Sequence, residues 1–201
     1  MWPRCEVVIA DYDPEKTRET FMAISRLTLP EFAGKIKWVD VYKSGIGIAR
    51  HLACKAAAGE IIVNFDADCR FERPDGIEKM VLALQDHKLA HCPNEIKPEE
   101  RQTDLKASSG DILYQSRNIL HEAGMPFPYE PGLTLRKETY EEIGGFRDVV
   151  MLEGPLLGFD ATLKYGLGAI KFVQDVKVMV SARRFIGSGA LLDLNYGNAY
   201  R

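Results

Sequence analysis

Residues 45–73 read GIGIARHLACKAAAGEIIVNFDADCRFER, a stretch that predicts a helix, a strand and an acidic turn in succession. Helix-forming residues occupy positions 46–58, and Gly59 ends this helix. The apolar run that follows predicts a buried strand over residues 61–65. Asp66-Ala67-Asp68 lies at the carboxyl end of that strand, which is the edge where open α/β sheets bind their ligands.

The acidic turn has the composition of a metal site. In an extended segment, residues i and i+2 point to the same side, so the carboxylates of Asp66 and Asp68 converge on one point. Two hard oxygen ligands suit Mg²⁺ or Mn²⁺. A bare D-x-D is more often a solvated acidic turn, so the surrounding pattern has to decide. The adjacent Cys69 carries a soft thiol and is predicted to be a small buried neighbour rather than a ligand.

The bulk composition excludes several classes of protein. The chain has 201 residues, which suits one domain, with 46% hydrophobic residues, 27% charged residues and a net charge of -3. Nucleic-acid binders usually show a basic excess, so no nucleic-acid partner is expected. No apolar run reaches the length of a membrane span, and the four cysteines form no C-x-x-C pair. We expect a cytoplasmic protein without an integral membrane segment, either free or peripheral to a membrane.

Strands and helices alternate through the first half of the chain. Strands are predicted at 6–10, 35–41, 61–65 and 88–92, with helices at 14–27, 46–58 and 74–86 between them. This order predicts a parallel, right-handed, doubly wound sheet of Rossmann-like α/β type. Residues 93–110 are polar with little periodicity and predict a long loop or short helices. Long loops in compact domains are often binding lids or acceptor-contacting segments. Further helices are predicted at 111–124 and 137–143, and strands at 132–135 and within 170–180.

Residues 47–68 carry the pattern G-x-A-R-x-x-(x)-C-x-x-A-x-G-E-I-I-V-x-F-D-A-D. This pattern resembles the family 2 glycosyltransferases of the GT-A fold. The resemblance implies one GT-A domain over residues 1–201 with a mostly parallel sheet. Residues 1–92 would form the nucleotide-sugar-binding half and residues 93–201 the acceptor-binding half. It also implies that Asp66 and Asp68 hold the metal on the donor diphosphate, with Ala67 and Arg50 beside them in the donor site.

A second match lies at residues 131–146, PGLTLRKETYEEIGGF. It resembles the family segment R-R-x-x-F-x-x-I-G-G-F, which sits on the acceptor side of the active site. The resemblance therefore implies that Arg136, Gly144, Gly145 and Phe146 lie on the acceptor side. Taken from the residues alone, a glycine pair after a helix is a common helix terminus. Two matches in the right order are stronger than either alone.

The resembled family also has an E-D pair followed by a leucine, in which the aspartate is the general base of inverting members. Asp160 has the downstream Leu163 but lacks the preceding glutamate, and Glu153 is the other carboxylate nearby. A general base must lie within hydrogen-bond reach of the proton that it removes, which a sequence does not show. Asp160 is the preferred general base and Glu153 is the alternative. Either residue could instead be a surface or helix-capping acid without a catalytic role.

Other donor-site residues are implied by position in the resembled family. They are Ala10, Asp11, Tyr12, Asp40, Arg183 and Arg184. Tyr12 would stack on the base and Asp40 would read its edge, although the usual D-D-G-S-x-D run around Asp40 is missing. The two arginines resemble an S-x-R-R segment that reaches the diphosphate. From the residues alone, Tyr12 could equally be a half-buried anchor and Asp40 a loop-facing acid. The arginine pair could equally be the solvated edge of a strand.

The function that the resemblance implies is a metal-dependent, hexosyltransferase-like enzyme. It would move a sugar from a nucleotide-diphosphate donor to a hydroxyl of a glycan, lipid or protein acceptor, with inversion, using Mn²⁺ or Mg²⁺. The small size is also similar to that of compact glycosyltransferases from crenarchaeal viruses. A non-catalytic nucleotide-sugar or glycan-binding protein is the alternative. A phosphatase of the haloacid dehalogenase type ranks lower, because two predicted strands precede the acidic motif and Phe71 follows Asp68 at the third place.

Overall fold

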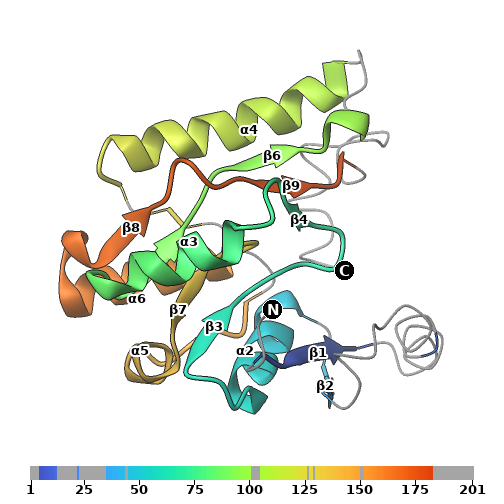
Figure 1. The fold of residues 1–201 in the computed structure, drawn as a ribbon, viewed down its shortest axis with the longest axis vertical. Coiled ribbons are helices and arrows are strands. Elements are labelled where there is room, and N and C mark those ends of the chain that lie inside the picture. The colour runs from blue at the N-terminus through green and yellow to red at the C-terminus, as the bar shows by residue number, and fades with distance from the viewer. Residues whose placement is uncertain are drawn as a thin grey trace.

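The structure is a computed structural model that describes residues 5–12, 22, 35–43, 45–100, 105–125, 127–128, 130–149 and 152–182 (Figure 1). The predicted helix at 14–27 and the arginines at 183 and 184 lie outside this described part, apart from Met22. The helices are α2 Ile46–Ala56, α3 Gly76–Leu82, α4 Leu105–Glu122, α5 Lys137–Glu142 and α6 Glu153–Tyr165. Short 3₁₀ turns lie at η2 Ala83–Gln85, η3 Pro98–Glu100 and η4 Leu167–Ala169. The strands are β1 Val7–Asp11, β2 Ile36–Asp40, β3 Ile61–Val63, β4 Arg70–Phe71, β5 Leu89–His91, β6 Asn94–Ile96, β7 Thr134–Arg136, β8 Ile170–Phe172 and β9 Val178–Val180.

The central sheet has the strand order β3-β7-β5-β8. β7 runs antiparallel to both β3 and β5, whereas β5 and β8 are parallel. β3 and β5 therefore point the same way, as the βαβ order predicts, but β7 from the second half of the chain lies between them. A parallel pair, β1 and β2, packs beside this sheet with α2 (Figure 1). The α/β fold class is confirmed, and the antiparallel strand β7 stands within a sheet that the strand–helix order predicted to be parallel.

Helices cover both faces of the central sheet, and β5 shows why. All of its residues are buried, and successive side chains of a strand point to opposite faces. Leu89 packs in a cluster with residues of α2, α5 and α6, while Ala90 packs in a second cluster with α3, β6 and β9. Packing on both sides therefore buries this strand completely.

A smaller sheet, β4-β9-β6, forms next to the central one. It corrects the prediction of a long loop over residues 93–110, since a strand and the short 3₁₀ turn η3 lie within this range. β6 pairs in parallel with β9, η3 follows it, and α4 already begins at Leu105 rather than at residue 111. The three-residue segment Asn94–Ile96 has little strand signal of its own, because its order comes from pairing with a strand more than 80 residues later. Within the described residues, no helix combines the length and apolarity needed to cross a membrane.

The Gly144-Gly145-Phe146 turn ends α5 and is fixed by Tyr140. Both glycines have positive φ, at 86° and 72°. A Cβ on Gly145 would lie 2.6 Å from Cζ of Tyr140, so the turn also needs the absence of a side chain there. The buried Tyr140 hydroxyl accepts a hydrogen bond of 3.0 Å from the backbone N–H of Phe146. The tyrosine therefore anchors the segment that follows the helix.

Replacement of Tyr140 by Phe is expected to lower the free energy of unfolding by about 1–3 kcal/mol, because the buried N–H of Phe146 loses its acceptor. Urea unfolding followed by circular dichroism measures the change. Tyr42→Phe is the matched control, since Tyr42 is 76% exposed. Equal unfolding midpoints for the two variants would contradict the proposed anchoring.

Candidate active site

The D-x-D motif lies at the tip of a turn that β7 helps to build. Past the last residue of β3, Asn64 donates to the carbonyl of Leu133 at 2.8 Å and accepts from Gly132 at 2.8 Å. The chain then turns, and the N–H of Cys69 donates to the carbonyl of Asp66 at 3.1 Å. The sequence predicted this strand-end position because a buried apolar strand stops where the carboxylates begin.

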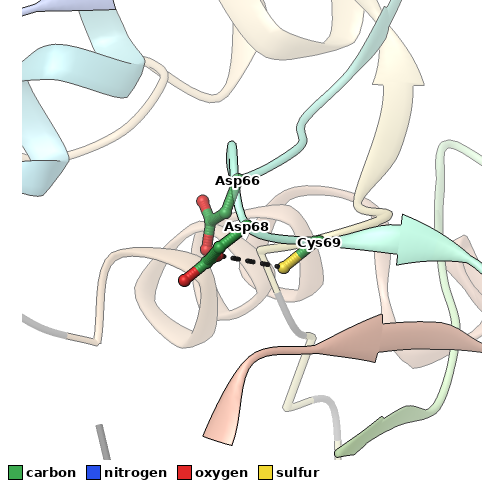
Figure 2. A group of neighbouring side chains, drawn as sticks. All are labelled: Asp66, Asp68 and Cys69. Atoms are coloured by element: carbon green, nitrogen blue, oxygen red, sulfur yellow. Dashed lines mark hydrogen bonds between the residues drawn. The ribbon is translucent and has the colours of Figure 1, made fainter. Parts of the chain in front are cut away.

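Asp66, Asp68 and Cys69 bring their potential ligand atoms within 4.8 Å of one another (Figure 2). The two carboxylates point to the same side of the turn, and the Cys69 thiol donates to Oδ1 of Asp68 at 3.5 Å. Burial raises the pKa of this thiol, and the charges of Asp66 and Asp68 raise it further. A protonated thiol is a poor metal ligand, so the donor set that fits a hard cation is the carboxylate pair.

Arg50 of α2 connects this turn to the start of α6. Its Nη2 donates to Oδ1 of Asp66 at 2.6 Å, and its Nε lies 3.3 Å from Oε1 of Glu153. The side chains of Arg50 and Glu153 are only 11% and 5% exposed, so this is a largely buried charge network. The Nε is buried and forms no hydrogen bond to the described residues, so its approach to Glu153 is an ion pair without hydrogen-bond alignment.

Glu153 is the first residue of α6, and Glu130 lies beside it. Glu130 belongs to the turn that precedes β7, and its Oε1 accepts a hydrogen bond of 2.9 Å from the N–H of Gly154. Burial raises the pKa of Glu153, and the negative charge of Glu130 raises it further, against the opposing effect of Arg50. Arg50 therefore bridges Asp66 of the D-x-D turn and Glu153 of α6, and Glu130 lies beside Glu153. Glu130 was not predicted from the sequence, since nothing in its local pattern distinguishes it from any acid before a turn.

Asp160, the general base predicted from the sequence, lies elsewhere on α6. It follows Glu153 by two helical turns, which is about 10 Å along the axis. Both of its carboxylate oxygens accept hydrogen bonds from Arg147, at 3.0 Å from Nε and 2.5 Å from Nη2. The structure thus brings the alternative candidate Glu153, and not Asp160, into the network with Arg50 and Asp66.

Residues 2–144 match the protein family described as Glycosyl transferase family 2. The chain belongs to this family. The match covers well over half of the sequence and includes both the D-x-D motif and most of the second motif, so the resemblance drawn from the sequence is confirmed. No curated protein matches the chain.

Solved structures give the same fold. A mannosyltransferase from Pyrobaculum calidifontis in complex with GDP-Man and Mn²⁺ has a TM-score of 0.64 at 20% identity, over 88% of this chain and 47% of that one. For GalNAc-T7 with UDP, GalNAc and Mn²⁺ the TM-score is 0.62 at 13% identity, over 88% and 38% of the two chains. Glucosyl-3-phosphoglycerate synthase from Mycobacterium tuberculosis, with Mn²⁺ and UDP-Glc, has a TM-score of 0.53 at 15% identity, over 84% of this chain and 57% of that one. The family 2 chain spans between 38% and 57% of these three proteins, and their similarity confirms its GT-A fold.

The base-binding candidates lie at the carboxyl ends of the first two strands of this family 2 fold. Asp11 and Asp40 are register partners in the parallel β1–β2 pair, so the structure brings these two acids together. Ala10 precedes Asp11 in β1, and the side chain of Tyr12 is 50% exposed just beyond it. Ala67 is exposed between the two metal-ligand candidates.

The acceptor-side candidates of the family 2 motif divide into two groups. Arg136 pairs with Ile61, the first residue of β3, and so lies at the amino end of this strand, while the D-x-D motif follows its carboxyl end. The structure does not bring Arg136 to the site. The Gly144–Phe146 turn instead leads into residues that pack on α2, where Gly47 donates to the carbonyl of Val149 at 3.3 Å. These residues support the helix that carries Arg50.

Proposed function

We propose that this chain is a metal-dependent glycosyltransferase that moves a sugar from a nucleotide-diphosphate donor to an acceptor hydroxyl, with inversion. The observation that carries the proposal is the convergence of Asp66 and Asp68 at the carboxyl end of β3 in a family 2 fold. The acceptor remains a glycan, lipid or protein in this proposal. Arg183 and Arg184 are retained as proposed diphosphate contacts.

Asp66 and Asp68 would hold Mn²⁺ or Mg²⁺. When bound, such an ion offsets the negative charge that develops on the leaving nucleotide. Arg50 holds the Asp66 carboxylate in place and adds a fixed positive charge to the same site. The structures of GDP-Man and UDP-Glc complexes that contain Mn²⁺ support both the choice of ion and a nucleotide-sugar donor.

Glu153 is proposed as the general base, in place of Asp160. A carboxylate whose pKa is raised accepts a proton more readily at neutral pH, and Glu153 is in this state. Arg50 pairs with both Glu153 and the metal-ligand candidate Asp66. Both carboxylate oxygens of Asp160, in contrast, accept hydrogen bonds from Arg147. Asp11, Tyr12 and Asp40 are proposed to bind the nucleotide base.

Metal-dependent stabilisation by a nucleotide sugar tests the donor site. At a concentration near 100 times Kd, a ligand that binds only the folded state adds about 2.7 kcal/mol, or about 5–10 °C in Tm for a chain of this size. We expect one of GDP-mannose, UDP-glucose or UDP-GalNAc to give this shift with Mn²⁺ and to give little shift with a chelator. The measurement is a thermal melt of the wild type and of Asp68→Asn, in which the shift should disappear.

Asp175→Asn serves as the control, because Asp175 is an exposed acid on the loop between β8 and β9. It should shift like the wild type. A stabilisation that is the same with Mn²⁺ and with chelator, or that survives in Asp68→Asn, would contradict the metal role of the D-x-D motif.

A further inference from the structure

The first turn of α6 receives no side-chain cap from its N-cap residue. Its N-cap residue, Leu152, has a left-handed backbone (φ 65°, ψ 19°) and an apolar side chain that accepts no hydrogen bond. The first N–H groups of a helix need outside acceptors. Glu130 supplies one, through its 2.9 Å contact with the N–H of Gly154, and its negative charge suits the positive end of the helix dipole.

The lack of a side chain at Gly154 leaves room for the Glu130 carboxylate. A Cβ at position 154 would lie 2.6 Å from Oε1 and 2.7 Å from Cδ of Glu130. Gly154 does not have a positive φ, so its backbone conformation does not require glycine. Alanine is the better helix former at such a position. The glycine is therefore explained by the approach of Glu130 and not by the geometry of the helix.

Glu130 is itself fixed to the segment that leads into the D-x-D motif. Its carbonyl accepts a hydrogen bond of 3.1 Å from Leu133, and Gly132 donates to the carbonyl of Asn64 at 2.8 Å. The Glu130–Gly154 contact thus joins the β3–β7 edge to the residue next to Glu153. The charged groups that face Glu153 are Arg50 from α2, Asp66 from the turn after β3 and Glu130 from the turn before β7.

We propose that Glu130 is a positioning residue: by binding the N–H of Gly154 it holds Glu153 against Arg50 in the geometry that turnover needs. The proposal rests on the proposed function of Glu153 as base. Glu130 acts through α6 and does not need to touch the substrate. The Glu130–Gly154 pair is then a single unit, in which the glycine provides the space and the glutamate provides the contact.

A double-mutant cycle on thermal stability tests this unit without any substrate. Gly154→Ala should lower Tm in the wild-type background, because its Cβ displaces the Glu130 carboxylate. In a Glu130→Ala background the space is open, and the same Gly154→Ala change should leave Tm unchanged or raise it. Equal losses of Tm from Gly154→Ala in both backgrounds would overturn the proposal.

Turnover separates positioning from a merely structural role. The assay follows release of nucleoside diphosphate from GDP-mannose and from UDP-glucose in the presence of Mn²⁺. Glu130→Ala should lower kcat by about 10²-fold with the donor KM unchanged, since a small displacement of a catalytic group has effects of this size. Glu130→Gln keeps an oxygen that accepts from Gly154 and should restore kcat close to the wild-type value.

A Glu130→Ala enzyme with wild-type kcat, or a Glu130→Gln enzyme as slow as Glu130→Ala, would overturn the positioning role. Wild-type turnover in Glu153→Gln would instead overturn the proposed base. In that case the thermal cycle still decides whether Glu130 and Gly154 act as one unit, so the two failures are distinguishable.

Discussion

Glu153→Gln is expected to lower kcat by a factor of about 10²–10⁴ with donor binding retained, because the amide cannot take the proton of the acceptor hydroxyl. Glutamine has nearly the same shape, so the buried start of α6 should remain packed. Since Glu153 is not a candidate metal ligand, the Mn²⁺-dependent stabilisation by the donor should persist. The measurements are kcat and donor KM from nucleoside diphosphate release, together with thermal melts.

Asp160→Asn is the matched variant, since it makes the same chemical change on the same helix. It disrupts the ion pair with Arg147 at a site two turns away from Glu153. We expect kcat to fall much less than in Glu153→Gln. If Asp160→Asn shows the larger loss and Glu153→Gln is nearly active, Asp160 is the base and the assignment drawn from the structure is wrong.

The features that the sequence predicted are those encoded by neighbouring residues. The helix over 46–58, the strand after it and the acidic turn each follow from periodicity and end signals within a few positions. The structure has α2, β3 and the D-x-D turn at these places. The position of the site at a strand end could be predicted for the same reason, because the apolar run and the carboxylates are contiguous in the chain.

The features that the sequence did not predict depend on partners far along the chain. β7 lies between β3 and β5, and β6 is ordered by β9, although neither arrangement leaves a mark on the local pattern. Glu130 could not be predicted for the same reason, since its contact is the N–H of Gly154, which is 24 residues away in the sequence. Pairing of this kind depends on the whole fold.

The choice of general base between Asp160 and Glu153 could not be made from the sequence for a third reason. Residues i and i+7 lie on nearly the same face of a helix, so both acids point to the same side of α6 and differ only in their distance from its start. A signal for that start was present. Pro155 stands within the first turn, where proline is tolerated, and it indicates that a helix begins close to Glu153.

Replacement of Arg50 by Met should have the largest effect on stability. Methionine fills similar space but removes the only positive charge that the described structure places between Asp66 and Glu153. Removal of one partner from a buried ion pair leaves an uncompensated charge and costs about 3–5 kcal/mol. We expect a loss of this size in the free energy of unfolding, measured by urea denaturation in the presence of a chelator.

Two comparisons make the Arg50 result specific. Arg70→Met, which breaks the exposed pair with Glu99, should change stability very little, because exposed ion pairs contribute weakly. In an Arg50→Met and Glu153→Gln double variant, the loss should be smaller than the sum of the single losses, because the orphaned charge of Glu153 is gone. Strict additivity would mean that Arg50 and Glu153 do not share a site. The network that links the metal-ligand candidate Asp66 to the proposed base Glu153 would then be absent from the folded protein, and the case for Glu153 over Asp160 would fail with it.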